Sequence, residues 1–195
     1  MALDLPEAVR EGVAAWRDAL LSHETQKVRR VDVEQLHVTL VFLGRQEARS
    51  ANGLAAAAFE CAERMAPPPI LKPAGVRAVP LRAPRLLALD LEDEGGRAAE
   101  LQGCISSALE SLGALKPEKR PFWPHVTLAR VRQGTRFTLT TDEGASVHEH
   151  APSGPFEPSA LTLYRSTLRP QGALYEPLER MPLGGEKPSG GTPSL

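Results

Sequence analysis

The chain has 195 residues, 42% of them hydrophobic, and its formal net charge is −1 at pH 7. This length suits one compact domain, or two closely packed lobes, with a sizeable core. Proteins that bind nucleic acid through bulk electrostatics are normally more basic, so that class is excluded and any phosphate site must be local. No segment approaches the ~18 consecutive apolar residues of a membrane helix, and residues 1–6 lack the basic start of a secretory signal peptide. We therefore expect a cytoplasmic protein without membrane contact.

The predicted elements alternate between strands and helices. In chain order, we expect a strand at 2–5, a helix at 6–21, strands at 28–33 and 36–43, a helix at 48–65, strands at 70–79 and 85–91, a helix at 96–112, and strands at 122–131, 160–168 and 173–178. This order indicates two βαββ units within one domain, residues 1–183. The tail at 184–195 consists largely of Gly, Pro and Ser, a composition typical of disorder.

The two cysteines, Cys61 and Cys104, both lie in predicted helices, and neither belongs to a Cys-x-x-Cys pair. This usage indicates buried free thiols in a reducing compartment.

One four-residue motif occurs twice. His-Val-Thr-Leu occupies residues 37–40 and recurs unchanged at 125–128, 88 positions later. With five His and ten Thr among 195 residues, chance alone gives roughly 0.26 of one His-x-Thr triplet. Two identical copies, half a chain apart, therefore indicate a duplicated lobe.

The period of a β-strand explains the spacing within the motif, because residues two apart share a face. His37 and Thr39 are predicted to point one way, as are His125 and Thr127. The opposite, core-facing set is expected to be Val38, Leu40, Phe42, Val126 and Leu128. A single strand histidine is usually structural, and threonine is an ordinary strand residue. Two matched copies, related by a pseudo-two-fold axis, instead predict a cleft lined by two imidazoles and two hydroxyls.

The tandem motifs resemble those of the 2H phosphoesterase superfamily, and within it the RNA 2',3'-cyclic phosphodiesterases, also called LigT-like proteins or 2'-5' RNA ligases. The resemblance spans nearly the whole chain and is carried by segments 2–6, 34–40, 42–44, 120–122, 124–130, 163–166 and 175–178. It implies an α+β, bilobal fold, in which two pseudo-symmetric antiparallel-sheet lobes, backed by helices, surround a central cleft.

The residues suit the chemistry that this resemblance implies. Opening a cyclic phosphate requires a base for water and an acid for the leaving alkoxide, and histidine, with an unperturbed pKa of about 6.5, can serve as either. The hydroxyls of Thr39 and Thr127 can donate hydrogen bonds to the non-bridging oxygens. The near-symmetry leaves the order of the histidines open. The resemblance implies that His37 is the proton donor and His125 the proton acceptor.

Three further residues are candidate substrate contacts. Arg130 lies five residues after His125, on the opposite face of an ideal strand, and reaches the phosphate only if the strand ends or bulges before it; a solvent-exposed strand end is the alternative. Tyr164 is a wall of the nucleotide pocket by resemblance, or otherwise a core aromatic. Trp123 can stack on a base, an interaction of roughly 1–3 kcal/mol.

The leading function is therefore metal-independent hydrolysis of 2',3'-cyclic phosphates on RNA ends or nucleotides, without a cofactor, by a monomer, in a role such as tRNA processing. The alternatives are reversible 2'-5' RNA ligation and a non-catalytic RNA-end or nucleotide-binding module. A metal site at His148 and His150 is disfavoured, because these residues sit in a polar loop without a cysteine or a second cluster nearby.

Overall fold

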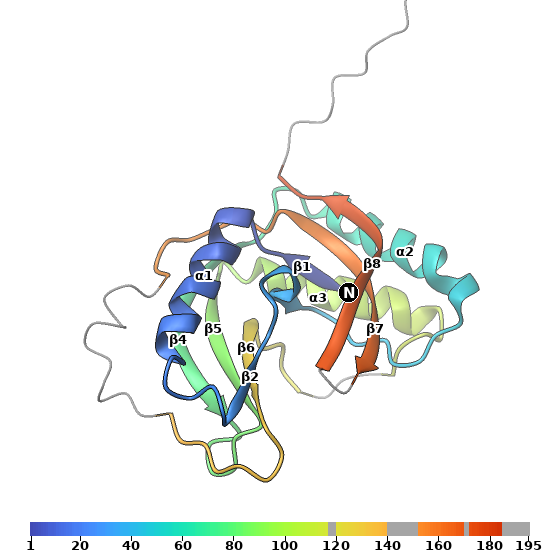
Figure 1. The fold of residues 1–195 in the computed structure, drawn as a ribbon. Coiled ribbons are helices and arrows are strands. Elements are labelled where there is room, and N and C mark those ends of the chain that lie inside the picture. The colour runs from blue at the N-terminus through green and yellow to red at the C-terminus, as the bar shows by residue number, and fades with distance from the viewer. Residues whose placement is uncertain (117–119, 140–151, 170–171, 185–195) are drawn as a thin grey trace, which may run out of the picture.

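The computed structural model describes residues 1–116, 120–139, 152–169 and 172–184. Its elements follow one another along the chain as drawn in Figure 1. They are β1 (Ala2–Asp4), α1 (Glu7–Leu20), β2 (Val28–Arg30), the 3₁₀ helix η1 (Val33–Gln35), β3 (His37–Thr39), the 3₁₀ helix η2 (Ala48–Ser50), α2 (Ala51–Arg64), β4 (Ile70–Val79), β5 (Leu86–Glu94), α3 (Arg97–Ser111), β6 (His125–Val131), β7 (Ala160–Arg169) and β8 (Gly172–Pro182).

The strands form one antiparallel sheet with the two motif strands near its centre. The order is β4-β5-β6-β3-β1-β7-β8, and β2 pairs with β6 off this path. The two motif strands, β3 and β6, are central neighbours and meet at the pair Val38–Val126. These valines are the same position in the two motif copies, so a pseudo-two-fold axis passes between them. The predicted α+β fold is confirmed, and its two halves share one continuous sheet.

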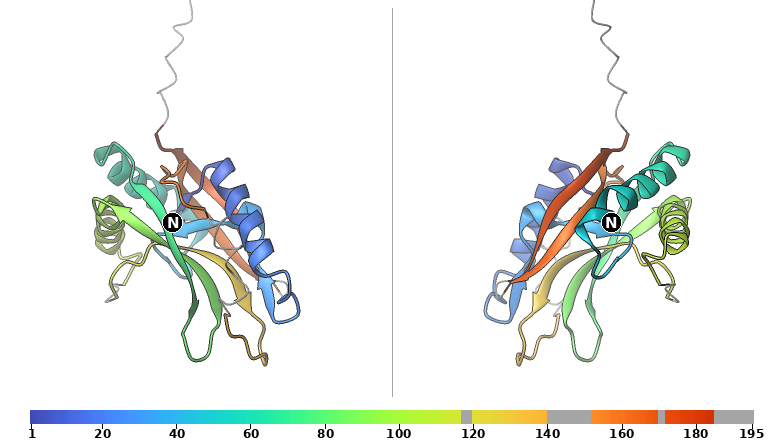
Figure 2. Two further views of the ribbon diagram at one scale, coloured as in Figure 1. Left: turned by 90° about the vertical axis from the view of Figure 1, so that its left-hand side faces the viewer. Right: turned by 90° about the vertical axis from the view of Figure 1, so that its right-hand side faces the viewer.

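The helices form because each buries one apolar stripe. In α3 the buried residues are Ala98, Leu101, Ile105 and Leu109, which recur at helical spacing. The backbone N–H groups of Ala98 and Ala99 donate to the Asp93 carboxylate, which satisfies the start of that helix. Helices α2 and α3 pack against each other on one side of the molecule, with α1 on the opposite side (Figures 1 and 2). No helix in the described part of the chain is long and apolar enough to cross a membrane.

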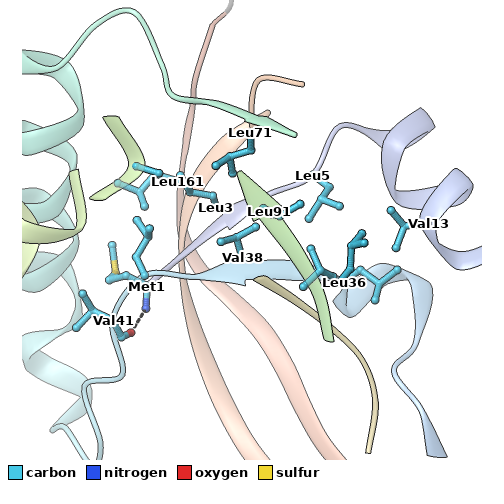
Figure 3. Packing of buried hydrophobic residues seen from close by; sticks show 14 of the residues in the cluster. Met1, Leu3, Leu5, Val13, Leu36, Val38, Val41, Leu71, Leu91 and Leu161 are labelled. Atoms are coloured by element: carbon cyan, nitrogen blue, oxygen red, sulfur yellow. Dashed lines mark hydrogen bonds between the residues drawn. The ribbon is translucent and has the colours of Figure 1, made fainter. Parts of the chain in front are cut away.

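The central core lies beneath the motif strands. Leu3, Val38 and Leu161 are fully buried and lie close together on β1, β3 and β7 (Figure 3). At one edge of this cluster the Met1 amine donates to the Val41 carbonyl. Because the even-numbered motif residues are buried here, the odd-numbered residues are left on the other face of the sheet.

Three predicted strands are clearly shorter than expected. The strand predicted at 28–33 ends at Arg30, and residues Val33–Gln35 form the 3₁₀ helix η1 instead. The strand predicted at 36–43 ends at Thr39, because the N–H groups of Leu40 and Val41 both donate to the Met1 carbonyl instead of continuing the ladder. Phe42 is therefore 70% exposed, and its predicted place in the core is wrong. The strand predicted at 122–131 begins only at His125, since Pro124 has no N–H to donate.

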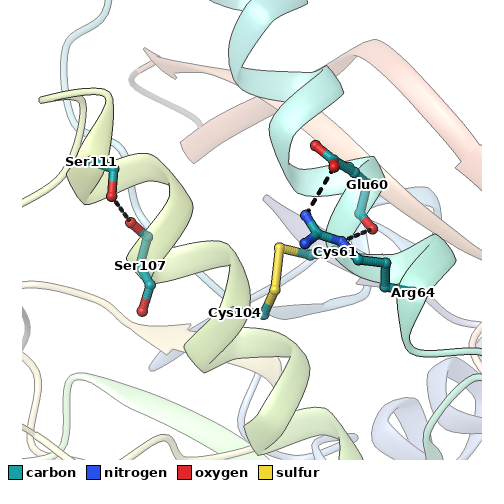
Figure 4. Close-up of a disulfide and its surroundings, with 6 residues drawn as sticks. All are labelled: Glu60, Cys61, Arg64, Cys104, Ser107 and Ser111. Carbon is teal, nitrogen blue, oxygen red and sulfur yellow. Dashed lines mark hydrogen bonds and ion pairs between the residues drawn. A yellow bond between two sulfur atoms is a disulfide. The ribbon is translucent and has the colours of Figure 1, made fainter.

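The prediction of free thiols is also wrong. Cys61 of α2 and Cys104 of α3 form a disulfide, with a Cα–Cα distance of 5.9 Å (Figure 4). The two residues are 43 positions apart. A short-range cysteine motif cannot reveal such a pair, because only the face-to-face packing of the two helices brings it together. The predicted disordered tail, apart from Gly184, lies outside the described residues.

Candidate active site

The four polar motif residues line one cleft. His37 and Thr39 come from β3, His125 and Thr127 from β6, and the cleft has a volume of about 750 Å³. Extending the Val38–Val126 register by one residue in each direction sets His37 beside Thr127 and Thr39 beside His125. Each imidazole therefore has a threonine hydroxyl from the other copy of the motif as its cross-strand neighbour.

The cleft carries a local positive charge in a chain that is nearly neutral. Its charged walls, apart from the histidines, consist of four arginines and one aspartate: Arg29, Arg30, Arg130, Arg132 and Asp32. Arg29 and Arg130 are direct cross-strand partners on β2 and β6. Like charges in this position normally destabilise a sheet, so the arrangement suits a bound anion.

Arg130 reaches the cleft because β6 contains a bulge. On β5, Leu87 and Ala88 are consecutive, yet their partners on β6 are Ala129 and Thr127. The extra residue, Leu128, is buried together with Ala129, and the alternation of faces is reversed beyond it. Arg130 thus shares a face with His125, as the bulge hypothesis requires.

The two imidazoles are held in related ways. His125 Nδ1 lies 2.8 Å from the carbonyl oxygen of Trp123, two residues before it. This contact favours the tautomer with a proton on Nδ1, so that Nε2 is the basic nitrogen. Nε2 of His37 lies 3.2 Å from Thr39 Oγ1. The backbone of Gln35, also two residues before its histidine, favours the protonated ring, although Nδ1 has no acceptor at good hydrogen-bond geometry among the described residues.

Burial dominates the electrostatics of both histidines. Loss of solvation lowers the pKa of His37 to about 4, although Gln35 and the Asp4 carboxylate act in the opposite direction. Burial also lowers the pKa of His125 from its usual 6.5, while the Trp123 carbonyl and Asp90 oppose that change and Arg77 and Arg130 add to it. Both rings are therefore neutral near pH 7 in the free protein, and each accepts a proton more readily once an anion lies in the cleft.

Two of the predicted substrate contacts lie against the histidines instead of along the cleft lining. The Trp123 ring stacks on His125, with centroids 3.8 Å apart and planes inclined by 15°. The Tyr164 ring stacks on His37 at 5.5 Å and 22°. Direct contact of either ring with a nucleotide stays a prediction.

Other functional candidates were missed by the sequence reasoning. Tyr175 lines the cleft and meets the His37 ring edge-on, with centroids 4.8 Å apart. Phe42 is an exposed aromatic in the same lining. Asp4 and Asp90 are the cross-strand partners of His37 and His125. A second repeat could have revealed these carboxylates, because Ala-Leu-Asp-Leu occurs at 2–5 and again at 88–91.

His148 and His150 lie outside the described residues. Within the ranges that are described, no three His, Cys, Asp or Glu side chains are grouped so that they could hold a metal ion.

The sequence resembles one protein family and several named proteins. Residues 5–169 match the family described as the 2'-5' RNA ligase superfamily. The RNA 2',3'-cyclic phosphodiesterase of Methanocaldococcus jannaschii is 24% identical over 176 residues, which cover 90% of this chain and 95% of that protein. The protein of the same name from Aeropyrum pernix is 28% identical over 171 residues, 85% of this chain and 92% of its own.

Solved structures resemble the fold over almost its whole length. A protein of Thermus thermophilus superposes with a TM-score of 0.71 at 27% identity, covering 95% of this chain and 97% of that one. Escherichia coli LigT, crystallised with 3'-AMP, superposes with a TM-score of 0.68 at 26% identity and covers 94% of this chain and 96% of its own.

Proposed function

Because the chain belongs to the 2'-5' RNA ligase superfamily, we propose that it hydrolyses 2',3'-cyclic phosphates at RNA ends or on nucleotides and leaves a 2'-phosphate. The observation that carries this proposal is the cleft in which both His-x-Thr motifs and Arg130 meet. Relatives that cover most of the chain bear the name RNA 2',3'-cyclic phosphodiesterase, which supports the same substrate class.

The reaction needs one proton acceptor and one proton donor. The Nε2 atom of His125 takes a proton from water as the water oxygen attacks phosphorus. The P–O3' bond breaks on the opposite side, and His37 gives its proton to the departing O3'. The products are a 2'-phosphomonoester and a free 3'-hydroxyl. A later proton exchange with solvent returns both imidazoles to their starting states.

The same cleft supplies groups for the negative charge that develops on the phosphate. The hydroxyls of Thr39 and Thr127 and the guanidinium of Arg130 line the cleft beside the two imidazoles. Donors of this kind stabilise the non-bridging oxygens most strongly in the transition state. Because protein side chains fill each role that the reaction requires, the proposed mechanism includes no metal ion.

Binding of the phosphate also prepares the acid. The pKa of His37 is lowered to about 4 in the free protein, chiefly by burial. A phosphate anion against the ring favours its protonated form, so substrate binding raises the fraction of His37 that can act as a donor. The substrate thereby helps to create the proton donor that its own cleavage requires.

Ligation is a second candidate, favoured by the family description. If the 5'-hydroxyl of a bound RNA replaces water as the attacking group, the same steps give a 2'-5' phosphodiester. Water at ~55 M favours hydrolysis unless the hydroxyl is held in place by binding.

The test is incubation of the purified protein with a 2',3'-cyclic mononucleotide, with phosphorus NMR as the readout. We expect the cyclic phosphate signal to be replaced by that of a 2'-monoester. Formation of the 3'-monoester would contradict the assignment of O3' as the leaving group, and absence of turnover would favour a binding module. A parallel sample with a 5'-hydroxyl oligonucleotide detects ligation as a longer product.

A further inference from the structure

Each histidine faces a carboxylate across the sheet. Asp4 on β1 is the register partner of His37, and Asp90 on β5 is the register partner of His125. Directly opposed residues of an antiparallel pair have side chains on the same face, with Cβ atoms about 5 Å apart. Both carboxylates belong to the second repeat, Ala-Leu-Asp-Leu, so the duplicated unit includes an aspartate as well as the His-x-Thr motif.

Around His37 the carboxylate holds an aromatic ring in place. The Tyr164 hydroxyl donates to Asp4 Oδ1 at 2.7 Å, and the same ring stacks on the imidazole. Asp4 Oδ2 accepts from the Thr162 hydroxyl at 2.8 Å and from Arg180 Nε at 3.1 Å. Only 13% of the Asp4 side chain is exposed. With three donors on one shielded carboxylate, the orientation of the tyrosine is fixed.

Around His125 the same arrangement is built from other residues. The Trp123 indole Nε1 donates to Asp90 Oδ1 at 2.9 Å, and the indole stacks on the imidazole. Arg77 on β4 pairs with Asp90 Oδ2 at 2.7 Å, and its guanidinium carbon lies 4.7 Å from the centroid of the Trp123 ring. The ring is thus enclosed between a cation and a histidine.

We propose that Asp4 with Tyr164, and Asp90 with Trp123, are two positioning clamps that fix the planes of the catalytic imidazoles. This inference rests on the proposed function, since it assigns roles to the groups around its two histidines. None of the four clamp residues is part of the cleft lining. They act through the histidines and are not catalytic residues themselves.

The duplication distinguishes this role from ordinary core packing. A single buried Tyr–Asp hydrogen bond is usually structural. Here the aspartates occupy equivalent positions in the two repeats, but the aromatic residues do not. One is a tyrosine on β7, Tyr164, and the other is a tryptophan in the segment before β6, Trp123. Two different rings in equivalent places satisfy the same need, a flat, polar-tipped surface against the imidazole.

The carboxylates also suit the proton transfers. Each histidine is an imidazolium during part of the reaction, and a nearby negative charge stabilises that state. Asp4 raises the pKa of His37 and Asp90 raises that of His125, both against the larger effect of burial. The clamp therefore orients the ring and partly offsets the cost of charging it.

The kinetic test uses Tyr164→Phe and Trp123→Phe, which retain an aromatic ring but remove its hydrogen bond to the aspartate. We expect kcat to fall about 10- to 100-fold, because small misplacements of a catalytic group have effects of that order. KM should change little, since neither residue lines the cleft. The matched controls are Arg165→Gln and Lys72→Gln. They break exposed ion pairs between β7 and β8 and between β4 and β5, and they should leave kcat unchanged.

A second measurement does not depend on turnover. NMR titration of the imidazoles should show the pKa of His37 falling further in Asp4→Asn, with little change at His125, and the reverse in Asp90→Asn. A structural role alone would lower the melting temperature without this residue-specific shift.

Failure of the clamp proposal and failure of the proposed function would give different experimental results. If His37→Ala and His125→Ala abolish turnover while both aromatic variants keep full kcat and both Asn variants leave the titrations unchanged, the clamp is wrong and the function stands. If the alanine variants stay active, the function itself fails.

Discussion

Val38 and Val126 face each other across β3 and β6, and they are the same position in the two copies of the repeated motif. Because the pseudo-two-fold axis passes through this pair, the histidine before Val38 and the histidine before Val126 enter one cleft from opposite directions along the sheet. In-line displacement at phosphorus needs a base and an acid on opposite sides of the reacting atom, and the proposed mechanism assigns these two roles to the symmetry-related histidines.

The first prediction concerns the two histidines. His37→Ala and His125→Ala should each lower kcat on a 2',3'-cyclic nucleotide about 10²- to 10⁴-fold, the usual contribution of a positioned acid or base. Circular dichroism should show an unchanged fold, since both rings lie at the cleft and outside the buried core. The control is His23→Ala, which changes a residue outside the cleft lining. Near-full activity in either cleft variant would refute the two-histidine mechanism.

The second prediction concerns the pH dependence. One histidine must be neutral and the other protonated, so kcat/KM should be bell-shaped. Because burial lowers both pKa values below 6.5, that of His37 to about 4, the limbs of kcat/KM should lie in the acidic range. In the complex the phosphate anion favours the imidazolium, so the limbs of kcat should be displaced to higher pH. Each limb of the pH profile reports on the coupled pair of histidines and is not assigned to one of them. Identical profiles for kcat and kcat/KM would contradict this electrostatic argument.

The repeated His-x-Thr motif made the central site predictable from the sequence, because alternation in a strand follows directly from side-chain spacing. The course of the chain beyond Thr39 did not follow from that rule. There, Leu40 and Val41 are both buried, and Phe42 turns outward because the Met1 carbonyl takes two N–H groups from the ladder. Competition for backbone hydrogen bonds between distant segments leaves no periodic signal in the sequence.

Long-range contacts account for the remaining differences. The bulge that brings Arg130 into the cleft depends on how β5 and β6 align, and the Cys61–Cys104 bond depends on how α2 meets α3. In contrast, Asp4 and Asp90 could have been predicted from the sequence. The two copies of Ala-Leu-Asp-Leu are separated by almost the same number of residues as the two copies of the histidine motif.

The third prediction concerns metal ions. Treatment with EDTA followed by desalting should leave kcat unchanged, because imidazoles, hydroxyls and Arg130 supply the roles that a metal would take. The measurement compares treated and untreated protein on the same cyclic nucleotide. Loss of activity that Zn²⁺ or Mn²⁺ restores would overturn the proposed mechanism.

The fourth prediction concerns the disulfide. It closes a loop between residues 43 positions apart, for which chain entropy gives a stabilisation of about 4 kcal/mol. The double variant Cys61→Ala, Cys104→Ala, or reduction of the native protein, should therefore lower the melting temperature clearly. Thiol titration in denaturant should find no free thiol before reduction and two afterwards. Two free thiols in the untreated protein, purified under oxidising conditions, would contradict the pairing.

The fifth prediction concerns stability and pH. The pKa of His37 is about 4 in the folded protein and 6.5 as the ordinary value, so the unfolded chain binds a proton first as the pH falls. Between these two values the unfolded state carries more protons, and the free energy of unfolding must decrease with falling pH. The stability associated with the neutral imidazole of His37 is fully present above pH 6.5 and is lost progressively toward pH 4.

The variant His37→Gln removes the titrating group. The difference in unfolding free energy between wild type and variant should therefore move in favour of the variant as the pH drops from 7 to 5. Urea denaturation at several pH values measures this difference, and carboxylates that titrate in the same range cancel because both proteins contain them.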